Sequence, residues 1–200
     1  LLLRMVGKRY VELVRNLPAL VLVFIFYFFV SDQIMPLLGV EEFIRSRTPG
    51  AQKVLGILFD QVSLFPQFIA GIFTVAIFEG AYITEIVRSG IESIEKGQRE
   101  AAYALGLSWT DQMRFIIMPQ ALRRIMPPMA NQFISTIKDS SIVAAISIQE
   151  LTFQGMQLAT STHYTFEVWI LITAMYLGLT LILSLLVNKL ERNMQSQGGN

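Results

Sequence analysis

One polar, basic stretch limits what this chain can fold into. It covers residues 96–127, reads KGQREAAYALGLSWTDQMRFIIMPQALRRIMP, and lies between long apolar runs. Charged side chains are costly within the hydrocarbon core of a bilayer, where a spanning helix needs about 20 mostly apolar residues. The pattern therefore predicts a helical membrane protein with this stretch outside the membrane.

The polar stretch has the pattern of two short helices joined at a glycine. Residues 98–105 are mostly good helix formers, and Gly106 stands where a helix usually ends in a left-handed residue. Ser108 is placed to cap a second helix, with Asp111 three residues further on. We expect this second helix to end at Pro119, because a prolyl ring disfavours continuation.

The first short helix also has a surface that suits docking. Ala101 and Ala102 are small, and the charges of Arg99 and Glu100 lie beside them. We expect both alanines to leave a low-relief surface that fits a partner's groove.

The apolar runs predict a single all-α membrane domain over residues 1–200. The chain is 53% hydrophobic with a mean hydropathy of +0.51, which is typical of membrane proteins. Residues 37–64 and 152–165 are predicted as outer loops, and 188–200 as a basic then polar tail. The predicted spans are about residues 18–36, 65–87, 127–149 and 166–187, with a cytoplasmic loop at 88–126.

Basic residues indicate the orientation. Residues 1–15, 88–124 and the tail after 188 carry Lys and Arg, whereas residues 152–165 carry neither. Because cytoplasmic loops are enriched in Lys and Arg, both ends of this chain and the polar loop are predicted to face the cytoplasm.

The order of residues in the polar loop resembles a known family. Glu100-Ala101-Ala102 is followed by Gly106 and, further on, by Ile117 and Pro119, and this order resembles the EAA loop of ATP-binding cassette (ABC) transporter permeases. The flanks AYITEIVRSGIESIEKGQREAAYALGLS and PQALRRIMPPMANQFISTIKDSSIVAAISIQEL resemble the permeases of bacterial polar amino acid importers.

The resemblance implies an architecture, a location and a set of partners. The fold would be the polytopic transmembrane domain of a type I importer in the bacterial inner membrane, and we expect one further span before residue 1. The partners implied are two ATPase subunits, a second permease subunit that is identical or homologous, a periplasmic amino acid binding protein and the lipid bilayer. The coupling element implied consists of Glu100, Ala101, Ala102, Gly106, Leu107 and Pro119.

The chain carries no nucleotide-binding motif of its own. Gly7-Lys8 is followed by Arg9 and lacks the upstream glycine of a phosphate-binding loop. We therefore expect ATP and Mg²⁺ on a partner ATPase and no cofactor on this chain. The net charge of +1 indicates no nucleic-acid partner.

Polar residues in two predicted spans are candidates for a substrate path. An ionisable group at the centre of a span costs about 2.5 to 3.5 kcal/mol and often marks a pathway. The predicted path residues are Glu79, Asn131, Ser135, Lys138 and Asp139, the last four on one helical face. Alternatively, Lys138 and Asp139 neutralise each other, snorkel or hold helices together, and Glu79 pairs with a base on a neighbouring helix.

A few other residues bear on packing, docking and chemistry. Ala76, Gly80 and Thr84 recur at every fourth position and predict a face for close helix packing. Trp109 is placed either to help docking or to lie at the membrane interface. His163 is the only histidine and the chain has no cysteine, so we predict neither a metal site nor catalytic residues.

Two other classes of protein are possible from residue patterns. A stand-alone secondary carrier or channel would also need polar residues in its spans, but it would not need the EAA pattern. A membrane-embedded enzyme such as a protease would need a nucleophile and base, or a metal cluster, which one histidine in an outer loop does not supply.

Overall fold

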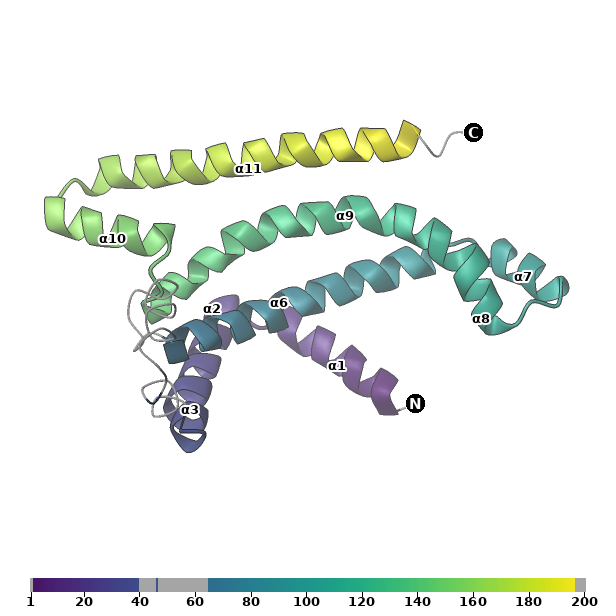
Figure 1. Ribbon diagram of the computed structural model, residues 1–200, viewed down its shortest axis with the longest axis horizontal. Helices are drawn as coiled ribbons and strands as arrows, with labels where there is room; N and C mark the ends of the chain where they lie inside the picture. The colour runs from purple at the N-terminus through teal and green to yellow at the C-terminus, as the bar shows by residue number, and fades with distance from the viewer. Residues whose placement is uncertain (1, 40–45, 47–64, 197–200) are drawn as a thin grey trace. The chain divides into compact units, whose positions relative to one another are not determined.

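The computed structural model describes residues 2–39, 46 and 65–196 (Figure 1). All regular structure in these residues is helical, which confirms the expected all-α fold. Most of the predicted outer loop 37–64 lies outside the described residues.

The chain before the polar loop forms helices α1, α2, α3 and α6. α1 covers Leu2–Asn16 and α2 covers Ala19–Phe26, and a wider π-helical segment, Tyr27–Ile34, leads into α3, Met35–Leu37. α6 covers Phe65–Glu92, so the helix through predicted span 65–87 continues beyond it.

The polar loop and the chain after it form α7 to α11. α7 covers Lys96–Ala104, α8 covers Trp109–Asp111 and α9 covers Met118–Asp139. α10 covers Leu151–Thr162 and α11 covers Thr165–Ser196, so residues 188–196, predicted as a tail, continue the last helix.

Two of the described helices are long and apolar enough to cross a membrane, Phe65–Glu92 and Thr165–Lys189. Met5–Asn16 and Ala19–Val30 together form a third candidate, with a bend of 109° at the break between them. The helix through predicted span 127–149 is not among these candidates. Its polar residues lower its hydropathy, and its assignment as a span stays a prediction.

The prediction that a short helix ends at Pro119 is wrong. α8 continues through a π-helical segment, Gln112–Ile117, directly into α9, and Pro127 and Pro128 also lie inside α9. The Met118 N–H donates to the Met113 carbonyl five residues earlier, which is the spacing of a π-turn. A wide turn just before a proline gives its ring room without ending the helix.

The prediction that residues 152–165 form a loop is also wrong for most of that range. Glu150 caps α10: its carboxylate oxygens accept the Phe153 N–H at 2.8 Å and the Thr152 N–H at 2.9 Å. The helix ends at His163, whose φ of 61° is left-handed. Glutamate is not a preferred cap residue, so the pattern gave no helix start here.

The chain forms two compact units, one of Leu1–Val11, Gly80–Ile137 and Leu177–Asn200, the other of Glu12–Glu79 and Lys138–Tyr176. In the first unit, the end of α6 packs against α9 around the buried side chains of Ile94, Ile117, Ala121 and Ile125. Gly90 permits this approach, because a Cβ there would lie 2.2 Å from Ile125 Cγ1.

The second unit has its own small cores. Val23 of α2 packs with Val143 and Ile146, which belong to the 3-10 helix Ser140–Ile146 that follows α9. α10 packs on α11 through Ala159, Val168 and Ile172. Gly155 makes that second contact close, since a Cβ there would lie 2.7 Å from Ile172 Cγ1.

The predicted face of small residues on α6 makes close contact only in part. A Cβ at Gly80 would lie 3.0 Å from the Tyr10 hydroxyl, so α1 approaches α6 there. Ala76 and Thr84 are exposed in this chain.

The contact at Gly90 yields a stability prediction. We expect Gly90→Ala to lower the free energy of unfolding by about 1 to 3 kcal/mol, because the methyl group overlaps the branched Ile125 side chain. Thermal unfolding of the detergent-solubilised protein measures this. Gly178→Ala is the control, since no atom lies within 4 Å of a Cβ there.

A double variant tests the contact itself. Gly90→Ala with Ile125→Ala should cost less than the sum of the two single changes, because the residues share one contact. If the two single changes in the free energy of unfolding add up to that of the double variant, the contact described for this pair is wrong.

Candidate functional site

The first half of the polar loop ends in a hydrogen-bonded glycine turn. The Gly106 N–H donates to the Tyr103 carbonyl at 2.9 Å and the Leu107 N–H donates to the Ala102 carbonyl at 3.2 Å. Gly106 has a φ of +75°. These two bonds define a Schellman motif, so the expected left-handed glycine is confirmed.

The second half begins with the expected cap. The Ser108 hydroxyl oxygen accepts the Asp111 N–H at 3.3 Å, and the hydroxyl donates to Asp111 Oδ2 at 2.6 Å. The Gln112 side-chain amide donates to the Leu107 carbonyl at 2.9 Å. The turn between α7 and α8 therefore has bonded caps on both sides, and we call residues 96–117 the coupling hairpin.

The predicted coupling residues differ in exposure. Glu100, Ala101, Gly106 and Pro119 are exposed and Leu107 is half-buried. Ala102 is only 3% exposed, so the expectation that both alanines form the docking surface is wrong for Ala102. Its small side chain packs inward, whereas Ala101 faces out.

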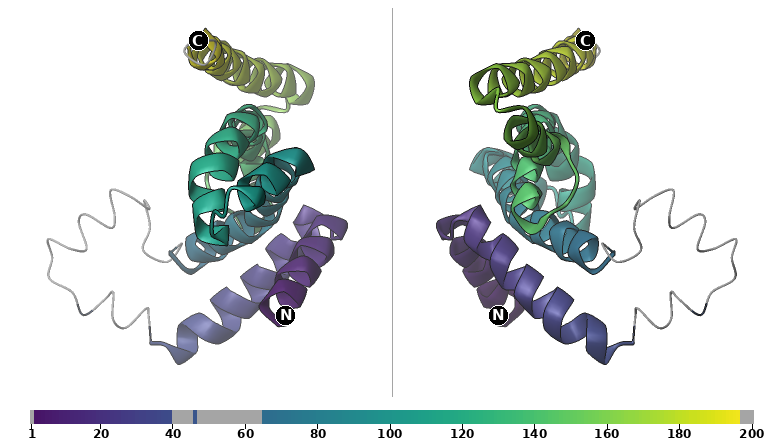
Figure 2. Two further views of the ribbon diagram at one scale, coloured as in Figure 1. Left: turned by 90° about the vertical axis from the view of Figure 1, so that its right-hand side faces the viewer. Right: turned by 90° about the vertical axis from the view of Figure 1, so that its left-hand side faces the viewer.

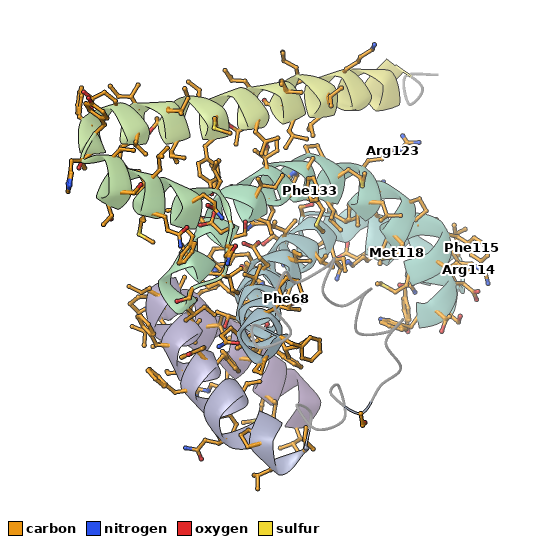
Figure 3. All side chains as sticks on the ribbon, turned by 60° about the vertical axis from the view of Figure 1, so that its left-hand side comes forward. Phe68, Arg114, Phe115, Met118, Arg123 and Phe133 are labelled. Carbon is orange, nitrogen blue, oxygen red and sulfur yellow. The ribbon has the colours of Figure 1, made fainter. Side chains whose placement is uncertain are left out.

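Large apolar side chains are exposed on the coupling hairpin. Tyr103 is 78% exposed and Leu105 is 80% exposed, and Trp109 and Phe115 are also open to solvent. Figure 3 shows Arg114 and Phe115 beside each other, and the Arg114 guanidinium lies 5.5 Å from the Phe115 ring centre. Exposed apolar groups among charges often mark a binding surface.

Sequence reasoning missed Tyr103, Leu105 and Phe115 as surface groups. The available signal was bulky apolar residues within a polar loop, but the loop's sequence does not decide which face of each short helix is buried.

A side-chain contact also joins α7 to α9. The Gln120 amide donates to Gln98 Oε1 at 3.3 Å and to the Ile116 carbonyl at 2.9 Å. This contact bridges residues 22 positions apart in sequence, and no local pattern predicts it.

Four of the predicted path residues lie on α9. Asn131, Lys138 and Asp139 are exposed, and Ser135 is half-buried. Within the described residues, the side chains of Lys138 and Asp139 form no hydrogen bond or ion pair, so the alternative that they neutralise each other is not observed here. Glu79 lies on α6 and is buried.

These five residues belong to different units. Asn131 and Ser135 are in the first unit, and Glu79, Lys138 and Asp139 are in the second. A joint substrate path through them therefore stays a prediction.

Asp139 marks a change in backbone geometry. It is the last residue of α9, and the chain then tightens into the 3-10 helix Ser140–Ile146, which ends at Ser147 with a φ of 64°. At membrane depth, irregular backbone is found where it is buried in protein or lines a water-filled cavity. The two exposed charges of Lys138 and Asp139 thus lie at a helix break.

A polar cluster follows this break. The Tyr176 hydroxyl on α11 donates to Glu150 Oε2 at 2.9 Å and lies 3.1 Å from the Thr152 hydroxyl oxygen. Sequence reasoning did not single out these residues, because their partners are 24 and 26 positions apart.

The long apolar helices and the capped hairpin define the class of the protein as an α-helical integral membrane protein. Residues 2–196 match the family described as the binding-protein-dependent transport system inner membrane component. The chain belongs to this family, which confirms the resemblance drawn from the EAA pattern.

Several amino acid transport proteins are similar to this chain. It is 43% identical over 141 residues to the glutamine transport system permease protein GlnP of Escherichia coli K12, covering 70% of this chain and 64% of that protein. It is 34% identical over 193 residues to the probable glutamine ABC transporter permease protein GlnM of Bacillus subtilis 168, covering 96% and 76%.

A solved structure has the same fold. The crystal structure of an amino acid ABC transporter with histidines matches with a TM-score of 0.71 at 32% identity, covering 94% of this chain and 75% of that chain. The fold class expected from the sequence, an ABC transporter transmembrane domain, is confirmed.

The left-handed glycine yields a local prediction. A Cβ at φ +75° costs roughly 1 to 2 kcal/mol, so Gly106→Ala should weaken the Schellman motif. We expect the Gly106 and Leu107 positions to exchange amide hydrogen at least about fivefold faster, since 1 kcal/mol changes a local opening equilibrium by about that factor.

Hydrogen exchange of the solubilised protein measures this effect. Gly97→Ala is the matched control, because Gly97 lies in α7 with no atom within 4 Å of a Cβ and without a positive φ. Equal exchange in the two variants would contradict the role given to Gly106.

Proposed function

We propose that the protein is the membrane-spanning permease subunit of an ATP-driven importer of polar amino acids. The single observation that carries this proposal is the coupling hairpin, which presents Glu100 and Ala101 to solvent on a helix closed by a bonded glycine turn. Coupling through an EAA loop is typical of the family to which the chain belongs.

The energy for transport comes from a partner. The sequence has no phosphate-binding loop, so an ATPase subunit docks on the coupling hairpin and supplies the ATP and Mg²⁺. The exposed side chains of Tyr103, Leu105 and Trp109 add apolar area to that contact. Two ATPases and a second permease subunit, identical or homologous, complete the transporter.

The family and the distribution of basic residues support the proposed location. The permease lies in the bacterial inner membrane and crosses it several times, with the basic coupling hairpin in the cytoplasm. A periplasmic binding protein delivers the amino acid from the opposite side.

The substrate class rests on relatives and on charge. Similar proteins are named for transport of glutamine, arginine and L-cystine, and these substrates all carry an amino group and a carboxylate. Asp139 is an exposed carboxylate at the helix break after α9, placed to accept hydrogen bonds from an amino group. Asn131, Ser135, Lys138 and Glu79 complete the proposed path.

Asp139 can be tested on its own. We expect Asp139→Asn to raise the substrate concentration for half-maximal uptake by about tenfold or more, since hydrogen bonds to charged groups contribute about 1.5 to 3 kcal/mol. Uptake of a labelled amino acid into vesicles that hold the whole transporter measures this. ATP hydrolysis by the same vesicles is the internal control, and unchanged half-saturation would contradict the role of Asp139.

Glu100 tests the docking surface. Glu100→Arg should leave membrane insertion intact but uncouple ATP hydrolysis from uptake, because it reverses an exposed charge on the face offered to the ATPase. Uptake and hydrolysis in reconstituted vesicles give the readout. Glu95→Arg is the matched control, because Glu95 is also exposed and its side chain makes no capping hydrogen bond.

The outcome that contradicts this assignment is normal uptake by Glu100→Arg at normal expression. Uptake by vesicles that hold this chain and no ATPase would instead favour a secondary carrier.

A further inference from the structure

The end of α6 leaves backbone carbonyls that need donors. The last four carbonyls of an α-helix have no partner within the helix. At this end the Ser93 hydroxyl donates to the Gly90 carbonyl at 2.7 Å, and the Ser93 N–H donates to the Ser89 carbonyl at 2.9 Å. The Ile91 carbonyl of α6 and the carbonyl of Ser93, the first residue after the helix, each accept a hydrogen bond from an arginine of another helix.

Arg99 reaches this end from the coupling hairpin. It lies in α7, and its Nη2 donates to the Ile91 carbonyl at 2.9 Å. Its side chain is half-buried, and its Nε atom is buried as well. A cation beside the carboxyl end of a helix is favoured by the helix dipole, and the guanidinium is weakly hydrated, which suits a half-buried position.

Arg124 reaches the same end from α9. Its Nη1 donates to the Ser93 carbonyl, 31 residues earlier in the chain. The carboxyl end of α6 is therefore bonded by one guanidinium group, and the residue that follows it by a second. We call Arg99 and Arg124, with the Ile91 and Ser93 carbonyls, the arginine clamp.

Packing beneath the clamp joins the end of α6 to the start of α9. Ile94 lies between α6 and α7 and is buried with Ile117, Ala121 and Ile125, and Ile91 and Met113 pack against this cluster. In the left view of Figure 2, α7 and α8 lie nearest the viewer, and Arg99 of α7 bonds the end of α6. After the turn at Gly106, the helical segment 109–139 runs without interruption into and through α9.

The connection from α7 to α6 is different. Only residues 93–95 join them in the chain, and a short irregular linker can act as a hinge. A force on α7 moves α6 only if something other than this linker resists bending. The clamp supplies that resistance, because the Arg99 bond spans the linker and the Arg124 bond ties it to α9.

We infer that Arg99 and Arg124 are positioning residues that transmit motion of the coupling hairpin to α6. The inference rests on the proposed function, in which an ATPase moves α7. Loss of the clamp would let α7 follow the ATPase while α6 lags, so ATP would be hydrolysed with less transport.

The chain offers a matched control at the neighbouring position. Arg123 is exposed, and Figure 3 shows its side chain pointing away from α6. Among the described residues its guanidinium group has no hydrogen bond or ion pair. Arg123→Met removes the same charge from the same helix and leaves the clamp intact.

The experiment compares amino acid uptake per ATP hydrolysed in vesicles that hold the whole transporter. Arg99→Met and Arg124→Met should each lower this ratio by about fivefold or more, the low end of typical coupling between two sites, while ATPase capture stays normal. Arg123→Met should keep the wild-type ratio. Arg99→Lys should give an intermediate ratio, because lysine keeps the charge but loses the planar fork.

The ratio separates coupling from simple instability, since a poorly folded permease loses uptake and stimulated hydrolysis together. If the Met variants are not inserted, Arg99→Lys and Arg124→Lys give the same comparison with the charge retained. If the wild-type transporter takes up amino acid and the clamp variants keep its ratio of uptake to ATP hydrolysis, the transmitting role of the clamp is wrong and the proposed function stands. Wild-type vesicles without ATP-dependent uptake would contradict the proposed function, and the clamp's transmitting role with it.

Discussion

The close approach of α6 and α9 at Gly90 is the contact on which the rest of the first unit depends. A side chain at this position would overlap Ile125, and only glycine lets the two helices pack over the buried cluster that includes Ile94. That approach brings Ser93, the first residue after α6, within reach of Arg124. The base of the coupling hairpin is thus fixed by packing first and by hydrogen bonds second.

The base of the coupling hairpin, where α6 and α9 pack around Ile94, and the outer surface of the hairpin have different tasks in the proposed importer. The base combines the buried cluster around Ile94 with the hydrogen bonds of Arg99 and Arg124, and in the proposed importer it transmits a displacement without deforming. The surface exposes Glu100, Ala101 and large apolar side chains such as Tyr103, which is the surface that the proposal offers to an ATPase. A coupling element between two subunits needs an outer surface that binds the partner. It also needs a rigid base that passes the partner's movement to the membrane helices.

The sequence predicted those features that depend on residues close together in the chain. The left-handed Gly106 and the Ser108 cap are local devices, and both are confirmed. Pro119 misled the prediction, because the π-turn that accommodates its ring has no strong sequence signal. α10 was missed because its cap is a glutamate.

The features that sequence reasoning missed are mostly long-range. Arg124 and the Ser93 carbonyl are 31 residues apart, and the pattern of the polar loop gives no sign of their contact. The inward orientation of Ala102 likewise depends on what α7 packs against, whereas the helix itself was evident from composition.

Site-specific photo-crosslinking from Ala101 tests the central claim most directly. The full-length protein would carry the crosslinker in native membranes, with Ile170 on the exposed surface of α11 as the control position. The account predicts a crosslink from Ala101, and not from Ile170, to a protein with a phosphate-binding loop, identified by mass spectrometry. Good expression with no ATPase recovered from Ala101 would contradict the account.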